Sequence, residues 1–314
     1  MHKFGVVFPG QGSQKQGMLT ELADARPIIA DTFREASGVL GFDLLAVVRD
    51  NPDGRLDETQ ITQPALLTAS VALWRLWLEE KGPLPELLAG HSLGEYSALV
   101  CAGVIGFEQA VDAVHKRGSY MQDAVPAGTG AMAAIIGLED DVIAKICAEA
   151  GQGDEIVSPA NFNAPGQTVI AGSAAAVERA VTALKEAGAK RALPLNVSVP
   201  SHCSLMREAA DRLGQDLAQL TFKRPEIPVV QNINGHVSKD PDTIRENLLK
   251  QLYMPVQWVD SIGCMRDFGI GKVVECGPGK VLSGLIRRIE RNMDCYTIED
   301  GDSLAGAREA IQQG

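Results

Sequence analysis

A short run around Ser92 limits most strongly what this chain can fold into. Residues 87–94 read Leu-Leu-Ala-Gly-His-Ser-Leu-Gly, so a G-x-S-x-G pattern directly follows three apolar residues. A helix-forming run at 95–102 comes next and stops at Gly103. Strand, sharp turn and helix are the context in which this pattern indicates a nucleophile elbow, with the serine hydroxyl exposed at the turn. Free N–H groups at the start of the helix would face an oxyanion on Ser92, whereas the alternative is a glycine-rich turn with an incidental serine.

A second glycine-rich turn, 9–14, follows an apolar, strand-like run at 4–8. Two phosphate-binding patterns nearly match it and both fail: Lys15 stands where G-x-G-x-x-G needs a glycine, and Met18 stands where the P-loop needs a lysine. We therefore expect no nucleoside triphosphate site. A loop of this kind can instead lend a backbone N–H group to an oxyanion hole.

Composition argues against several classes of protein. The 314 residues are 45% hydrophobic and 22% charged, as in a soluble globular protein, and the net charge of −11 argues against nucleic-acid binding. No signal peptide and no run of about 18 apolar residues is present, so we expect no membrane span. The six cysteines lack C-x-x-C spacing, which predicts free thiols in the cytoplasm and no metal site.

The order of the predicted elements indicates two subdomains. The segment 129–197 reads strand 131–137, helix 139–150, strand 155–162, a turn at 163–166, strand 167–172, helix 174–187 and strand 189–197. This β-α-β-β-α-β order is ferredoxin-like. The flanking parts, 1–128 and 198–314, would form one large subdomain around the elbow. We therefore expect an α/β fold: an α/β-hydrolase-like large subdomain with an inserted ferredoxin-like small subdomain.

Apolar periodicity predicts the other elements of the large subdomain. Pro64 suits the first turn of the second predicted helix. The expected helices are 25–37, 63–80, 107–123, 204–220, 242–252, 257–268 and 280–291, and the expected strands are 227–230 and 273–276.

A serine nucleophile needs a general base, most often histidine. His202 is preferred over His236 because it lies at a strand-to-helix junction, where α/β folds collect functional side chains, while His236 sits in a surface turn. No Asp or Glu between Ser92 and His202 stands out as the third member of a triad. A backbone carbonyl or an amide could orient the imidazole instead, which would make the site a dyad.

Arg117 lies at the edge of the apolar face of the helix predicted at 107–123. Its guanidinium could simply extend to solvent along that face. Alternatively, it is half-buried and binds a carboxylate in bidentate fashion. The sequence leaves both interpretations open.

Taken together, eight motifs in this order resemble the malonyl-CoA:acyl carrier protein transacylase family over nearly the whole chain. They are Phe-Pro-Gly-Gln-Gly-Ser-Gln (8–14), Thr-Gln-Pro-Ala (62–65), Gly-His-Ser-Leu-Gly-Glu-Tyr (90–96), Gly-Thr-Gly-Ala-Met (128–132), Asn-Phe-Asn-Ala-Pro-Gly-Gln (161–167), Val-Pro-Ser-His (199–202), Pro-Val-Gln-Trp (255–258) and Glu-Cys-Gly-Pro-Gly (275–279). Related polyketide-synthase domains usually carry another tetrapeptide before the histidine, so 199–202 favours the discrete enzymes of fatty-acid synthesis.

The resemblance implies a role for each matching residue. Ser92 would be the nucleophile and His202 its base, oriented by the backbone carbonyl of Gln251. The remaining implied residues are Gln11 and Leu93, whose N–H groups would form the oxyanion hole, Arg117, which would hold the malonyl carboxylate, and Asn163, which would line the cleft between the subdomains.

The implied activity is transfer of malonyl from coenzyme A to the phosphopantetheine thiol of an acyl carrier protein through a malonyl-serine. No metal or organic cofactor is implied, and we expect a monomer. Docking an acidic carrier needs local basic side chains, for which there are two candidate groups: Lys185, Lys190 and Arg191, and Lys280, Arg287, Arg288 and Arg291. A thioester hydrolase on the same elbow and a non-catalytic carrier-binding module are the alternatives.

Overall fold

A parallel sheet with β1 (Phe4–Phe8) at its centre forms the larger part of the structure, a computed structural model that describes residues 3–126, 128–195 and 199–313. All five residues of β1 are buried. Val6 and Phe8 pack into one core and Val7 into another, because successive side chains of a strand point to opposite faces. β1 is therefore covered by helices on both faces, as its continuous apolar sequence predicts.

The large sheet has the strand order β11-β10-β1-β2-β7-β8. The other strands are β2 (Leu87–Gly90), β7 (Val229–Val230), β8 (Val237–Ser238), β10 (Lys272–Cys276) and β11 (Asp294–Ile298). Every pair is parallel except β7 and β8. The sheet brings the ends of β1 and β2 side by side, with Phe8 opposite Gly90. The glycine-rich turn at 9–14 therefore starts next to the elbow.

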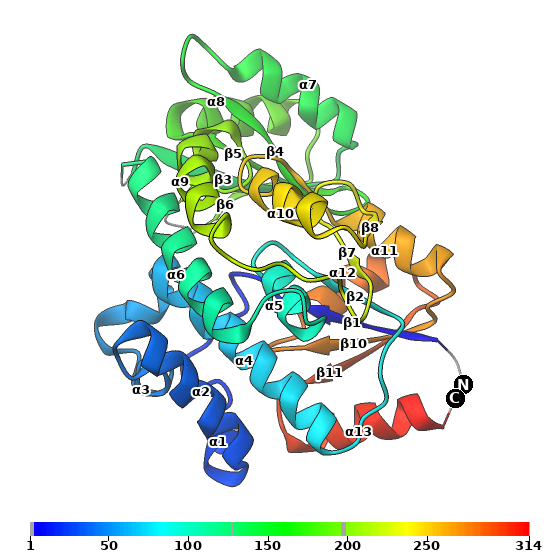
Figure 1. Cartoon of the computed structure of the whole chain (residues 1–314). Coiled ribbons are helices and arrows are strands. Elements are labelled where there is room, and N and C mark those ends of the chain that lie inside the picture. Colours follow the sequence, from blue (N-terminus) through cyan, green and yellow to red (C-terminus); the bar gives the residue numbers. More distant parts are fainter. Residues whose placement is uncertain (1–2, 127, 196–198, 314) are drawn as a thin grey trace.

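Helices cover the two faces of this sheet unequally (Figure 1). One core contains side chains of α1 (Thr20–Ala25), α2 (Pro27–Leu40), α3 (Leu44–Asp50), α4 (Thr59–Glu79), α5 (Gly94–Cys101), α6 (Phe107–Ala124), α9 (Arg207–Leu217), α10 (Pro241–Lys250) and α13 (Gly301–Gln312). The other core contains side chains of α11 (Trp258–Asp267) and α12 (Val281–Ile289). Two short 3₁₀ helices cover Pro52–Asp57 and Ser204–Met206.

A second, smaller sheet has the order β6-β3-β5-β4-β9. Its elements are β3 (Gly130–Ile136), α7 (Asp140–Ala150), β4 (Val157–Ala164), β5 (Gln167–Ser173), α8 (Ala174–Glu186), β6 (Arg191–Pro194) and β9 (Val256–Gln257). The first four strands pair antiparallel, and α7 and α8 pack on one face of them. The expected fold class, an α/β-hydrolase-like part with a ferredoxin-like part, is confirmed.

The small sheet also takes a strand from the large subdomain, which the sequence did not predict. β9 pairs with β4 in parallel, with Asn161 opposite Val256. We keep 129–197 as the proposed small subdomain and 1–128 with 198–314 as the large one. The second boundary, between 197 and 198, lies outside the described residues, as does the end of the strand expected at 189–197.

The prediction that Pro64 occupies the first turn of its helix is wrong. α4 begins at Thr59, so Pro64 stands inside the helix. Proline has no N–H group and leaves the carbonyl four residues earlier, here that of Gln60, without its helical partner. The ring nitrogen Nδ1 of His115 on α6 lies 2.8 Å from that carbonyl oxygen and replaces the lost hydrogen bond.

The expected turn at 163–166 is also too long. β4 continues through Asn163 to Ala164, so only Pro165 and Gly166 make the turn into β5. Because Asn163 lies in a strand, its side chain has a fixed direction. That direction takes it into the cavity described next.

Candidate active site

Ser92 sits on a tight turn between β2 and α5, in the left-handed backbone region with a φ of 52°. A Cβ atom on Gly90 would lie 1.9 Å from the backbone of Gly94, and one on Gly94 would lie 2.1 Å from the carbonyl oxygen of Phe8. Neither position can hold a side chain. Left-handed backbone at a non-glycine residue costs about 1–3 kcal/mol and is typical of functional turns.

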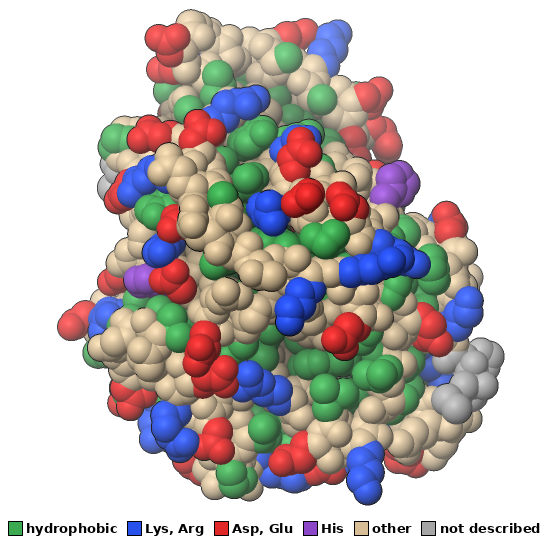
Figure 2. All heavy atoms as spheres, viewed as in Figure 1, with side chains coloured by type: hydrophobic (Ala, Val, Ile, Leu, Met, Phe, Trp, Pro, Cys, Tyr) green, Lys and Arg blue, Asp and Glu red, His purple; other side chains and the backbone are tan. Residues whose placement is uncertain are grey.

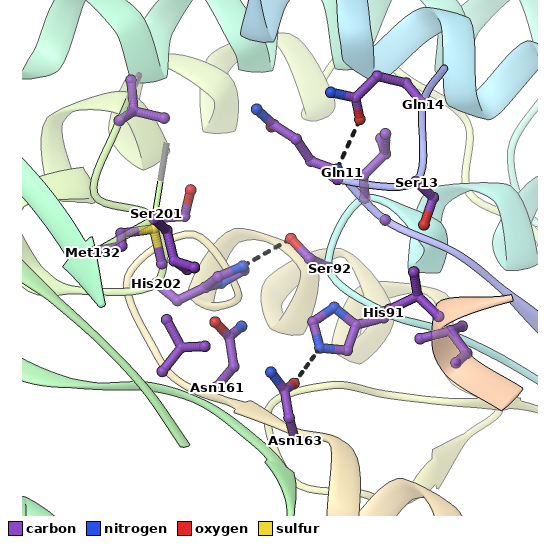
Figure 3. A pocket seen from close by; sticks show the side chains of 18 of the residues that line it. Gln11, Ser13, Gln14, His91, Ser92, Met132, Asn161, Asn163, Ser201 and His202 are labelled. Carbon is purple, nitrogen blue, oxygen red and sulfur yellow. Dashed lines mark hydrogen bonds between the residues drawn. The ribbon is translucent and has the colours of Figure 1, made fainter. Parts of the chain in front are cut away.

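The side chains of Ser92 and His202 point toward each other across the cavity (Figure 3). Ser92 Oγ lies 2.7 Å from His202 Nε2, and His202 Nδ1 lies 2.6 Å from the backbone oxygen of Gln251. Because a carbonyl oxygen only accepts, Nδ1 carries the proton and Nε2 presents its lone pair to the serine hydroxyl. His202 also has a positive φ, 62°, and its N–H donates to the carbonyl of Leu252 at 2.9 Å.

His202 is kept neutral by its surroundings. Its side chain is buried, and burial lowers the imidazole pKa to about 3, with a further contribution from the positive charge of Arg117. A neutral imidazole can take the proton of Ser92, whereas an imidazolium cannot. His236, the other candidate base, is exposed in the loop between β7 and β8 and is not part of this site.

A cavity of about 420 Å³ opens in front of the Ser92–His202 pair. Both subdomains line it. The predicted site residues in its lining are Ser92, Gln11, Leu93, Arg117, Asn163 and His202, while Gln251 lies behind His202. Asn163 Oδ1 accepts a hydrogen bond from His91 Nε2 at 2.7 Å, and the His91 ring packs edge-on against Trp258. His91 therefore points away from Ser92, toward the small sheet.

The backbone N–H groups of Gln11 and Leu93 are available for an oxyanion. Both residues line the cavity, and within the described residues neither N–H donates to another group. Leu93 is the residue that precedes α5, so its N–H belongs to the free end of that helix. The two donors lie in the turns that follow β1 and β2, whose neighbouring ends meet at this edge of the sheet.

Arg117 is buried, with 1% of its surface exposed, which excludes the interpretation that it extends to solvent. Nη1 donates to Gln63 Oε1 at 2.8 Å and Nη2 to Gln251 Oε1 at 3.1 Å, while Nε has no partner among the described residues. The guanidinium lies 5.7 Å from the centre of the Tyr96 ring. A buried cation whose direct acceptors are neutral amides favours an anion in the adjoining cavity.

A buried hydrogen-bond network lies behind the elbow, and its members Asn232, Glu95 and Gln63 were given no role from the sequence. Asn232 Oδ1 accepts from Ser92 N at 2.7 Å and its Nδ2 donates to the carbonyl of Gly90 at 2.6 Å. Asn232 thus holds both ends of the strained turn. Its position directly after the strand at 227–230 was the available signal, because strand ends collect functional residues in such folds.

The basic side chains that were predicted to dock a carrier lie on the surface. The face that carries α10 shows acidic and basic side chains interspersed (Figure 2). Helix α12 also carries basic side chains, and its Val281 and Leu285 line the cavity. The seven cations predicted to dock a carrier are exposed and form no ion pair within the described residues, which is also true of Lys81, Lys223 and Lys239 elsewhere on the surface. The seven are Lys185, Lys190, Arg191, Lys280, Arg287, Arg288 and Arg291.

Among the described residues, no cluster of three or more His, Cys, Asp or Glu side chains could hold a metal ion. None of the described helices is long and apolar enough to cross a membrane.

A serine paired with a neutral histidine beside a cavity is the arrangement that acyl transfer requires. The chain belongs to the acyl transferase domain family, whose model matches residues 6–298. The resemblance noted in the sequence is confirmed. The chain is 55% identical to the malonyl CoA-acyl carrier protein transacylase of Escherichia coli (strain K12) over 309 residues, 98% of this chain and 100% of that protein.

Solved structures agree in sequence and in fold. An acyl carrier protein S-malonyltransferase from Vibrio cholerae is 57% identical, with a TM-score of 0.94 over 97% of this chain and 99% of that one. A malonyl-transacylase solved in complex with its type II PKS acyl-carrier protein is 54% identical, with a TM-score of 0.96 over 98% of this chain and 99% of that one.

Proposed function

We propose that this chain transfers malonyl from coenzyme A to the phosphopantetheine thiol of an acyl carrier protein, for fatty-acid synthesis, through a malonyl-serine at Ser92. The observation that carries the proposal is one cavity that joins the Ser92–His202 pair, at 2.7 Å, to the buried cation of Arg117. The first group performs acyl transfer, and the second selects an acyl group that ends in a carboxylate. The names of the relatives support the same reaction.

In the first half-reaction, Ser92 Oγ attacks the carbonyl carbon of the malonyl thioester while His202 Nε2 takes the hydroxyl proton. The tetrahedral oxyanion is bound by the N–H groups of Gln11 and Leu93, each contributing about 3–4 kcal/mol. The carbon–sulfur bond then breaks, and His202 returns the proton to the sulfur of the leaving coenzyme A. Gln251 keeps the imidazole in the required tautomer through its backbone oxygen.

In the second half-reaction, the carrier thiol gives its proton to His202 and its sulfur attacks the malonyl-serine ester. The carbon–oxygen bond breaks and Ser92 Oγ recovers the proton. Arg117 pairs with the malonyl carboxylate throughout, and Asn163 lines the same cavity near the acyl group. These groups need no metal and no organic cofactor.

We propose that α12 and the adjoining edge of the small subdomain dock the carrier. An acidic carrier needs positive charge, and the cations of these two segments are exposed and form no ion pair among the described residues, although the whole chain carries −11. Arg288 also donates to Gln167 Oε1 at 2.6 Å, which joins the two segments. Arg288→Glu is expected to raise the KM for the carrier protein several-fold and to leave loading of Ser92 from malonyl-CoA unchanged. Unaltered carrier kinetics would contradict this docking surface.

We further propose that the chain acts as a monomer in the cytoplasm. Every group of the proposed mechanism comes from one chain, so a single copy suffices. All six cysteines are free thiols, as expected in a reducing compartment. Light scattering at enzyme concentrations used for assays tests the oligomeric state, and a stable dimer would refute the first part.

Intact-mass spectrometry tests the function directly. Incubation with malonyl-CoA is expected to add one malonyl group to the chain, and Ser92→Ala is expected to abolish the adduct. Addition of a phosphopantetheinylated carrier should move the group to the carrier. A thioester hydrolase would release malonate to water without any carrier, and a non-catalytic binding module would form no adduct, so either result would overturn the proposal.

A further inference from the structure

Glu95 is a buried carboxylate that the proposed mechanism does not use. It lies one turn after Ser92 on α5, with 1% of its surface exposed. Its Oε2 accepts hydrogen bonds from Gln251 Nε2 at 2.7 Å and from the backbone N–H of Asn232 at 3.2 Å. Its Oε1 has no partner among the described residues. An acidic side chain so deeply buried needs a compensating charge or a proton.

The side chain of Gln251 joins this carboxylate to Arg117. Its Oε1 accepts from Arg117 Nη2 at 3.1 Å, while its Nε2 donates to Glu95 Oε2. The amide thus presents its negative end to the cation and its positive end to the carboxylate. Arg117 and Glu95 are thereby coupled through one buried amide group.

Few other groups near this pair can change charge. Tyr96 follows Glu95 on α5, and burial raises the pKa of its phenol, so it stays neutral. His202 is neutral because burial lowers the pKa of its imidazole, and burial lowers that of His91 as well. In the part of the chain that the structure describes, β1, β2 and the segment 231–235 present no titratable side chain, and α4 contributes the amide of Gln63.

We propose that Glu95 is the resident counter-charge of Arg117 and takes up a proton when the carboxylate of an incoming acyl group pairs with that arginine. This inference rests on the proposed function. Above pH 7, where Glu95 is ionised, an empty site holds one positive and one negative charge. A bound malonyl group adds a second negative charge, and one proton from solvent on Glu95 restores neutrality. The malonyl carboxylate itself stays ionised and paired with the guanidinium.

The electrostatics of the empty site support this exchange. Burial raises the pKa of Glu95 to about 7, while Gln251, Asn232 and the charge of Arg117 oppose the rise. An arginine neutralised by a substrate carboxylate no longer opposes it, so the affinity of Glu95 for a proton increases. Binding of a carboxylated acyl group is then linked to one proton and weakens about tenfold per pH unit above neutrality. An acetyl group carries no charge and has no such linkage.

Calorimetry on the Ser92→Ala protein measures this proton without any chemistry. Binding of malonyl-CoA at pH 8 in buffers of different ionisation enthalpy is expected to show uptake of up to one proton, and acetyl-CoA is expected to show none. Ser92→Ala with Glu95→Gln should show none with either thioester. Ser92→Ala with Glu275→Gln is the matched control: Glu275 is also buried, but it binds the start of α12, and the uptake should persist.

Infrared difference spectra of the unmutated protein give a second readout. Loading with malonyl-CoA should add the C=O stretching band of a protonated carboxyl group. A malonyl adduct without this band, or equal proton uptake with malonyl-CoA and acetyl-CoA, would overturn the role of Glu95 and leave the proposed function intact. Uptake that persists in Glu95→Gln would also overturn it, and absence of any adduct would overturn both. Because the infrared measurement uses the unmutated protein, it tests the role of Glu95 even if Glu95→Gln fails to fold.

Discussion

The burial of Glu95 makes a quantitative prediction about stability. In the unfolded chain this carboxyl loses its proton near its ordinary pKa of 4.5, but in the folded chain it keeps the proton up to about pH 7. The folded pKa is raised, so the contribution of Glu95 to the free energy of unfolding is fully present below pH 4.5 and is lost as pH rises toward 7. A difference of about 2.5 pH units corresponds to about 3 kcal/mol. Glu95→Gln carries no titratable group at this position and escapes that loss.

Urea unfolding from pH 4 to pH 8.5 measures this difference, with the buried Trp77 and Trp258 as fluorescent reporters. At pH 4 position 95 is neutral in both the parent and Glu95→Gln. The difference in stability measured at pH 4 is therefore the reference for the differences at higher pH. The stability of Glu95→Gln relative to the parent is expected to rise by about 3 kcal/mol between pH 4.5 and pH 8. The titration of His202 is common to both proteins and cancels. A relative stability that stays constant over this range would refute the argument that Glu95 is held in a desolvated site.

Three further substitutions test other parts of the site. Arg117→Ala is expected to lower kcat/KM for malonyl loading by roughly 10²–10⁴, the loss of two charge-assisted hydrogen bonds, and to change acetyl loading less than tenfold; equal losses would show a structural role. Gly94→Ala should abolish loading because its methyl group would meet the carbonyl of Phe8, whereas Gly284→Ala, in open space on α12, should leave loading unchanged. Asn232→Ala should cost about 2–4 kcal/mol in urea unfolding and slow loading, and full stability would contradict its role in the turn.

The elements that depend only on neighbouring residues were predicted from the sequence. The elbow follows from three apolar residues, two obligatory glycines and a helix-forming run, all within sixteen positions. The ferredoxin-like order follows from the alternation of strand and helix periods between 130 and 194. The last two elements, β11 and α13, were not assigned, although Asp300 caps α13 in a capping box with Ser303. This capping box is a local signal in the sequence for the start of α13.

Features that depend on distant segments could not be predicted from the residues. Pro64 stands inside α4 because His115, 51 positions later, binds the carbonyl that the proline leaves free. His202 was preferred as the base of Ser92 because of its place at a strand-to-helix junction, and the family resemblance implied the same pair. The carbonyl of Gln251 came from the resemblance alone. The link from Arg117 through that glutamine to Glu95 joins residues from three segments, and no pattern along the chain reports it.

Strand β9 affects how the chain can be re-engineered. Residues 256–257 pair with β4 of the small subdomain. If 129–197 is exchanged between relatives, β4 is transferred but its neighbouring strand β9 is not. A graft must therefore keep the register of Asn161 with Val256, or it leaves the backbone groups of β4 without partners. The same two-residue ladder ties the walls of the cavity together.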